Sequence, residues 1–202
     1  MVNGSNISQS TVDDLVKAGC GFFEASRAET GGGEPTSTAF LRNLFTQSLI
    51  SFKIIDKAAD QMNLTVSKAQ IADKGSGQTI PKGLQGEDRE RLQNFFMLST
   101  RSDLQRAVIG AHLKDPSVTN ADHVTQSQIE DSTKFLKAFT LKQDVSVNPA
   151  YGTWSEGELL NTDGSLSAAQ SPAAKKWLNL REQTSNGSSD GVAGLPPSQV
   201  CG

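Results

Sequence analysis

The stretch TSTAFLRNLFTQSLISFKIIDKAADQM, residues 36–62, decides the fold of this chain. Apolar residues recur in it at steps of three and four, the spacing that places side chains on one face of an α-helix. They are Leu41, Leu44, Phe45, Leu49, Phe52, Ile55, Ala59 and Met62, and Phe40, Ile50 and Ile54 widen the face. Because a helix that is apolar on so many sides must be covered on those sides, the stretch predicts the central helix of a bundle.

Other segments with helical periodicity flank this central helix. They are 11–26, where Ser8 or Ser10 can cap the start, a short segment from 67, the long segment 85–114 with a bend at 99–102, and 125–141. Ser67 with Gln70, and Thr125 with Gln128, have the spacing of a capping box, in which the two side chains satisfy each other's backbone N–H groups. These signals predict a mostly helical domain.

Two segments have β-like sequence. Residues 2–8, VNGSNIS, contain an Asn-Gly turn, and residues 144–154, DVSVNPAYGTW, alternate Val145 and Val147 with polar residues. Since an isolated strand leaves its backbone groups without partners, we expect the two segments to pair. The predicted fold class is therefore mainly α, a helical bundle closed by a small β pairing between the N-terminal strand and a strand after the last core helix.

Composition changes after residue 154. Gly, Ser, Ala and Pro dominate the remainder, in which 173–182 alone has helical character and 186–199 is expected to be disordered. We therefore expect one domain at 2–154 and a mostly disordered extension at 155–202.

Charge and hydropathy exclude several classes of protein. A net charge of −3 and a pI near 5.4 give no basic footprint for nucleic acid. No apolar run approaches the roughly 18 residues of a membrane span. Met1 is followed by polar residues rather than by a signal peptide, which fits either a native start or a start codon added to a trimmed mature chain.

The two cysteines, Cys20 and Cys201, lie near opposite ends of the chain. They form no CxxC motif and no cluster with histidine, so we expect no metal site. In an oxidising compartment they could form a disulfide. Otherwise Cys20 would be a buried thiol and Cys201 an exposed one.

Catalytic motifs are not evident. The two histidines, His112 and His123, have no local Ser-His-Asp or Cys-His arrangement, and His112 reads as a surface or half-buried helix residue. The glycines at 31–33 lack the strand and lysine of a phosphate-binding loop, and the acidic residues of 86–92 suit a helix N-terminus. We therefore expect no catalytic residues, no cofactor and no enzymatic activity.

Apolar residues on the predicted helices are candidates for binding polypeptide, because Met and Phe adapt to varied apolar segments. The candidates are Leu41, Phe45, Phe52, Phe95, Phe96 and Met97. The alternative, that these side chains simply form the core, is the ordinary fate of such residues.

The order of these elements resembles the SurA-type N-terminal domain of extracytoplasmic bacterial chaperones. The segments that carry the resemblance are VNGSNISQSTVDDLV (2–16), KAADQMNLTVSKAQIAD (57–73), LQNFFMLSTRSDLQRAVIGAHL (92–113) and DVSVNPAYGTW (144–154). The sequence departs from the family pattern at Asn63, where glycine is usual.

The resemblance implies a holdase-like chaperone that binds unfolded or incompletely folded envelope proteins without ATP, through an apolar groove between helices. It also implies an extracytoplasmic location, with membrane attachment only through a lipid anchor that this sequence lacks. Many relatives carry a parvulin prolyl isomerase domain before the last helix. Here the short segment 115–124 occupies that place, so we expect no isomerase activity.

The alternative is a structural or adaptor lipoprotein that binds one dedicated envelope partner. A strand-swapped homodimer is a further expectation, because the N-terminal strand and its expected partner are far apart in the sequence.

Overall fold

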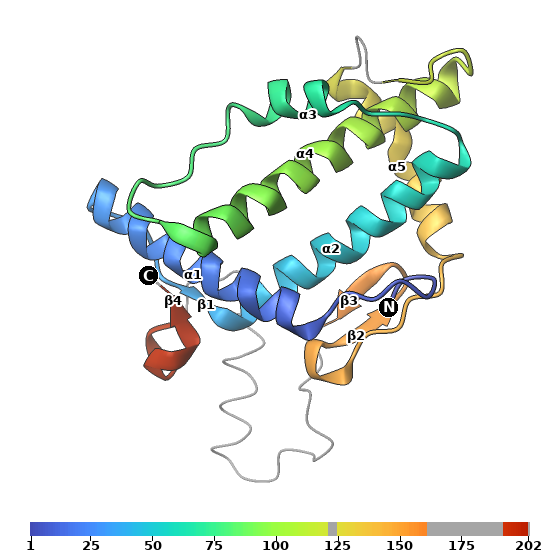
Figure 1. Cartoon of the computed structure of the whole chain (residues 1–202). Helices are drawn as coiled ribbons and strands as arrows, with labels where there is room; N and C mark the ends of the chain where they lie inside the picture. The colour runs from blue at the N-terminus through green and yellow to red at the C-terminus, as the bar shows by residue number, and fades with distance from the viewer. Residues whose placement is uncertain (121–124, 161–191, 202) are drawn as a thin grey trace. The chain divides into compact units, whose positions relative to one another are not determined.

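A computed structural model describes residues 1–120, 125–160 and 192–201. Figure 1 traces the chain. Its helices are α1 (Gln9–Thr30), α2 (Thr38–Gln61), α3 (Lys68–Gly75), α4 (Gly86–Lys114) and α5 (Gln126–Thr140). The prediction of a mainly helical fold with small antiparallel β pairing is confirmed. The expected helical segment 173–182 lies outside the described residues.

Local capping explains where several helices begin. Ser8, rather than Ser10, caps α1, because its side chain accepts a hydrogen bond of 3.0 Å from the backbone N–H of Thr11. The capping box that begins α3 is formed, with 3.2 Å from the Gln70 N–H to Ser67 Oγ and 2.7 Å from the Ser67 N–H to Gln70 Oε1. In contrast to the expected bend, α4 is helical without interruption across 99–102, a stretch that contains no helix-breaking residue.

The chain divides into two compact units. Unit 1 comprises Met1–Asn6, Ser48–Thr79 and Gln93–Val145, and unit 2 comprises Ile7–Gln47, Ile80–Leu92 and Ser146–Gly202. Both α2 and α4 contribute residues to each unit.

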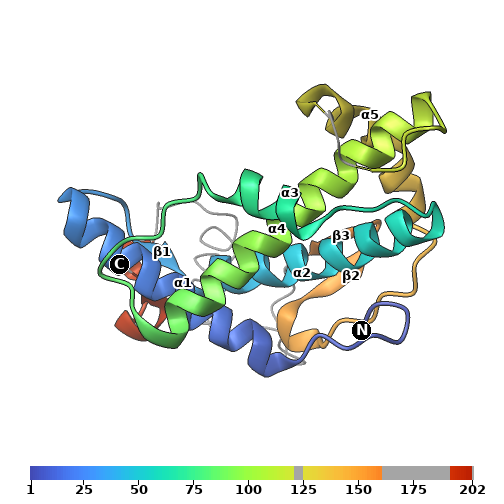
Figure 2. The ribbon, with the colours of Figure 1, turned by 45° about the horizontal axis from the view of Figure 1, so that its top comes forward.

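Unit 1 has its core where α2, α3, α4 and α5 meet. Its buried side chains are Ile55, Ala58, Ala59, Leu64, Ile71, Leu104, Val108, Ile109 and Leu136. Figure 2 shows α5 beside the C-terminal part of α4. An ion pair of 2.5 Å between Lys114 Nζ and Asp131 Oδ2 joins the two helices there.

The predicted clasp between the chain's start and 144–154 is reduced to a single bridge in unit 1. Val2 pairs antiparallel with Val145, and the Asn3 N–H donates to the Asp144 carbonyl at 2.8 Å. Neither Val2 nor Val145 belongs to a longer strand. Val2 also pairs with Ser5 across the tight Asn-Gly turn, which uses up the backbone that a longer strand would need.

Two strands follow Val145 in the sequence, and both belong to unit 2. β2 (Thr153–Ser155) pairs antiparallel with β3 (Glu158–Leu160), so the hairpin crosses the domain boundary that the sequence suggested at 154. The connecting residues Glu156 and Gly157 have φ values of 53° and 89°, as a tight two-residue hairpin turn requires.

Residues 192–201 have defined structure, which corrects the expectation of disorder for 186–199 over residues 192–199; residues 186–191 lie outside the described residues. Two 3₁₀ turns, Val192–Gly194 and Pro197–Gln199, lead into β4 (Val200–Cys201), which pairs antiparallel with β1 (Thr36–Ser37). Val192 and Leu195 are buried. A disulfide joins Cys201 to Cys20 in α1, so that these two apolar residues and one covalent bond fix the segment.

Candidate functional site

Three of the predicted binding residues form an aromatic row in unit 1. The ring centroids of Phe52 in α2 and Phe95 in α4 are 5.5 Å apart, and those of Phe95 and Phe96 are 6.1 Å apart. Both distances fall in the range at which tilted aromatic rings attract each other. Phe95 in the middle is buried, whereas Phe52 and Phe96 are half-buried. The aromatic row is therefore partly exposed at its two ends and buried in its middle.

Met97 and Leu98 follow the aromatic row in the sequence of α4, and both are exposed to solvent. Their exposed fractions are 37% and 40%. The sulfur of Met97 lies only 3.3 Å from the position that a Cβ on Gly75 would take, so the glycine makes room for it at the end of α3. Leu98 is not among the binding candidates predicted from the sequence. It follows buried Phe95 by three residues and precedes buried Ser102 by four, so its spacing predicts a buried position and gives no signal of its exposure.

A polar clamp holds α2 to α4 next to the aromatic row. One oxygen of Asp56, four residues after Phe52, accepts hydrogen bonds from Arg101 at 2.8 Å and from Gln105 at 2.7 Å. Gln105 is buried, and burial makes an unpaired amide costly, so this contact fixes the lateral position of the two helices. These contacts therefore join the two helices that carry the aromatic row.

Leu41 and Phe45 do not belong to this site. They lie in unit 2 with exposed fractions of 1% and 4%. A Cβ added to Gly19 of α1 would lie 2.9 Å from the ring of Phe45 and 3.2 Å from Leu41, so both side chains pack directly on that glycine. The burial of Leu41, Phe45 and Phe95 places these predicted binding residues in the interior.

The side chains that could ligate a metal, and the surroundings of His112, are defined in the described part of the chain. No group of three or more His, Cys, Asp or Glu side chains there could hold a metal ion. His112 is half-buried, and its Nδ1 donates to the carbonyl of Val118 at 2.8 Å, so the ring fixes the loop after α4. His123 lies outside the described residues.

One tyrosine has a displaced pKa. Burial, and then the negative charge of Asp13, raise the pKa of Tyr151 above its ordinary value of 10. Its hydroxyl donates to Asp13 Oδ1 at 3.4 Å, and Asp13 also lies 3.9 Å from Arg42. Both effects keep the phenol neutral, which suits a structural hydrogen bond rather than a base.

Comparison with known proteins adds no relative. No family model matches this chain, and neither a characterised protein nor a solved structure is significantly similar to it. None of the described helices is both long enough and apolar enough to span a membrane.

Proposed function

We propose that this chain is a non-enzymatic polypeptide-binding protein that holds unfolded or incompletely folded envelope proteins without ATP. The observation that carries the proposal is the aromatic row, with Met97 and Leu98 exposed near it, on two helices that the contacts of Asp56 join. The four segments that resemble the SurA-type domain support the same function. In this proposal the Val2–Val145 bridge is what remains of the clasp that closes such a domain.

Binding would proceed by burial of a client's apolar side chains against Phe96, Met97 and Leu98. Each square ångström of apolar surface removed from water contributes roughly 25 cal/mol. A methionine thioether and an exposed ring edge tolerate clients of different shape, since both adapt at low cost. The supporting helices would not need to move.

We also propose an extracytoplasmic location. The Cys20–Cys201 disulfide supports it, because such bonds form and persist in oxidising compartments and are rare in the cytosol. Membrane attachment through a lipid anchor is a part of the proposal that the resemblance alone supports. Pairing of two copies is a part that rests on the distance in sequence between the N-terminal segment and its partner.

The test is suppression of aggregation of two unrelated unfolded proteins, without ATP, at rising amounts of the chain. We expect suppression at near-stoichiometric ratios and its loss in a Met97→Ser, Leu98→Ser double variant. The matched control is Leu113→Ser, which removes a leucine of similar exposure, 44%, from the other end of the same helix. Equal suppression by all three proteins would show that the surface next to the aromatic row does not bind clients.

A dedicated envelope partner is the second candidate. It is favoured by the burial of Leu41, Phe45 and Phe95, which leaves a smaller apolar surface than a general holdase would use. The two functions differ in the range of proteins that the chain would bind. Binding of several unrelated unfolded proteins would favour the holdase, and tight binding of one folded protein with no effect on unfolded ones would favour the adaptor.

A further inference from the structure

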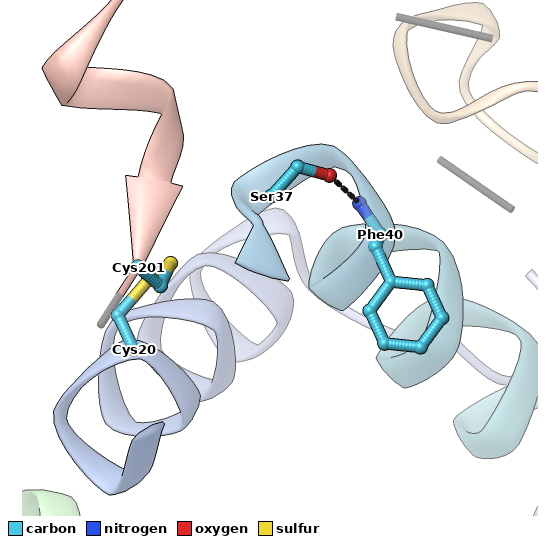
Figure 3. The surroundings of a disulfide bond; sticks show 4 residues. All are labelled: Cys20, Ser37, Phe40 and Cys201. Carbon is cyan, nitrogen blue, oxygen red and sulfur yellow. Dashed lines mark hydrogen bonds between the residues drawn. A yellow bond between two sulfur atoms is a disulfide. The ribbon is translucent and has the colours of Figure 1, made fainter. Parts of the chain in front are cut away.

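The end of the chain forms a strap, residues 192–201, that is fixed to unit 2 by three kinds of contact. Val192 and Leu195 are buried, β4 pairs with β1, and Cys201 is bonded to Cys20. Figure 3 shows the disulfide between α1 and the end of β4, close to Ser37. In the described part of the chain, the ladder between β4 and β1 has two residue pairs. A ladder this short holds a strand weakly, so the covalent bond is the main restraint.

Ser37 connects the strap to α2. Its backbone pairs with Val200 of the strap, and its hydroxyl oxygen accepts a hydrogen bond of 3.0 Å from the Phe40 N–H, as drawn in Figure 3. Ser37 is thus both a strand residue and the N-cap of α2. An N-cap residue needs an extended backbone, and pairing with β4 maintains that conformation.

The first turns of α2 carry Leu41 and Phe45, the apolar residues that pack on Gly19 of α1. Their burial depends on α2 beginning where it does. Loss of the strap would remove the partner of Ser37, loosen the cap and allow these turns to fray.

We propose that Cys20–Cys201 is a redox latch, opened by a protein dithiol of the Cys-x-x-Cys class, that controls the order of the first turns of α2 and the exposure of Leu41 and Phe45. The proposal does not depend on client binding. It assigns to the disulfide a role in switching, in addition to its role in holding the strap.

The exchange follows from the burial of the two cysteines. Cys20 is half-buried and Cys201 is fully buried, so the reductant's thiolate attacks Sγ of Cys20. The Cys20–Cys201 bond breaks, Cys201 leaves as a thiolate, and a mixed disulfide forms between Cys20 and the reductant. The reductant's second thiolate then attacks its own bonded sulfur and releases Cys20. Two electrons pass to the protein, and both cysteine thiolates take up protons.

The experiment is amide hydrogen exchange on the full chain, oxidised and then reduced with a small dithiol. Protection is compared at Phe40 and in the strap, with Val108 and Ile109 in the core of unit 1 as the reference for global opening. We expect reduction to accelerate exchange at Phe40 by roughly five- to tenfold more than at the reference amides, the size of a lost N-cap. If reduction accelerated exchange equally at all positions, the disulfide would be a global stabiliser and the latch proposal would be wrong. The proposal would also be wrong if reduction did not accelerate exchange at Phe40.

A variant tests the link that Ser37 makes between the strap and the start of α2. Ser37→Ala in the oxidised protein should accelerate exchange at Phe40 while the strap amides of Leu195 and Gln199 stay protected, because the cap is lost and the disulfide is intact. An apolar dye provides an independent readout, with higher fluorescence expected for the reduced protein. Protection of Phe40 that is the same in Ser37→Ala and in the unaltered protein would contradict the coupling.

Discussion

Gly110 in α4 lies against the backbone carbonyl of Gln128 in α5, so close that a Cβ at residue 110 would overlap the carbonyl oxygen. Both residues belong to unit 1, and the adjacent Ser132 is completely buried. The two helices therefore meet backbone to backbone at this point, and no other residue type fits at 110.

Replacing Gly110 by alanine should reduce the free energy of unfolding by about 1–3 kcal/mol, the usual cost of forcing an extra methyl group into a packed core. Urea denaturation measures this. The control is Gly77→Ala, since Gly77 is exposed and an added Cβ there would meet no atom within 4 Å. It should change stability by less than about 0.5 kcal/mol. Equal stability of the two variants would show that α4 and α5 do not approach as described.

Tyr151 is the one tyrosine of the chain, so its ionisation can be followed by tyrosinate absorbance without interference. Because burial and Asp13 raise its pKa, we expect it to ionise above pH 10 in the folded protein. The unfolded chain loses its proton first as the pH rises. The free energy of unfolding should therefore fall as the pH rises above 10. Well below pH 10 the tyrosine is neutral in both states, so its ionisation should not make the free energy of unfolding depend on pH.

The Asp13→Asn variant checks the cause of the shift in Tyr151. Removing the carboxylate charge should move the tyrosine pKa toward its ordinary value, leaving the part caused by burial. A titration curve identical to that of the unaltered protein would mean that Asp13 has no influence on the phenol.

Arg91 in unit 2 is the shared partner of three carboxylates. It lies 3.6 Å from Asp14 of α1 and 2.9 Å from both Glu87 and Asp88. Arg91→Gln should lower the melting temperature, because these like charges are then left together. Added salt should narrow the gap to the unaltered protein by screening the repulsion. Arg106→Gln is the control and should have a smaller effect, since among the described residues Arg106 has one ion pair, of 3.8 Å, with Asp103.

Gly152 sits in the Tyr-Gly-Thr-Trp segment before the hairpin. Its φ is 127°, and a Cβ there would overlap the Leu160 carbonyl. Gly152→Ala should therefore disrupt the hairpin and lower the melting temperature. Gly32→Ala, at a loop position where an added Cβ would meet no atom within 4 Å, should leave the melting temperature almost unchanged. Equal melting temperatures would indicate that the hairpin does not pack against Gly152.

Several features of the fold were predictable from sequence because local physics controls them. Helix periodicity identified α2, and the Ser67–Gln70 and Thr125–Gln128 pairs form the capping contacts that their spacing predicts. These signals involve residues three or four positions apart, so they can be read from the local sequence without knowing the fold of the rest of the chain.

The sequence by itself determined which segments are helical and which side chains are apolar. Only the tertiary structure decided which apolar residues are buried, because burial depends on the neighbouring element rather than on spacing. Gly19 packs against Leu41 and Phe45 and places them in the core, whereas Met97 and Leu98 remain on the surface. Likewise, composition suggested disorder for the chain's end, but pairing with β1 and the bond to Cys20, which is 181 residues away in sequence, hold it in place.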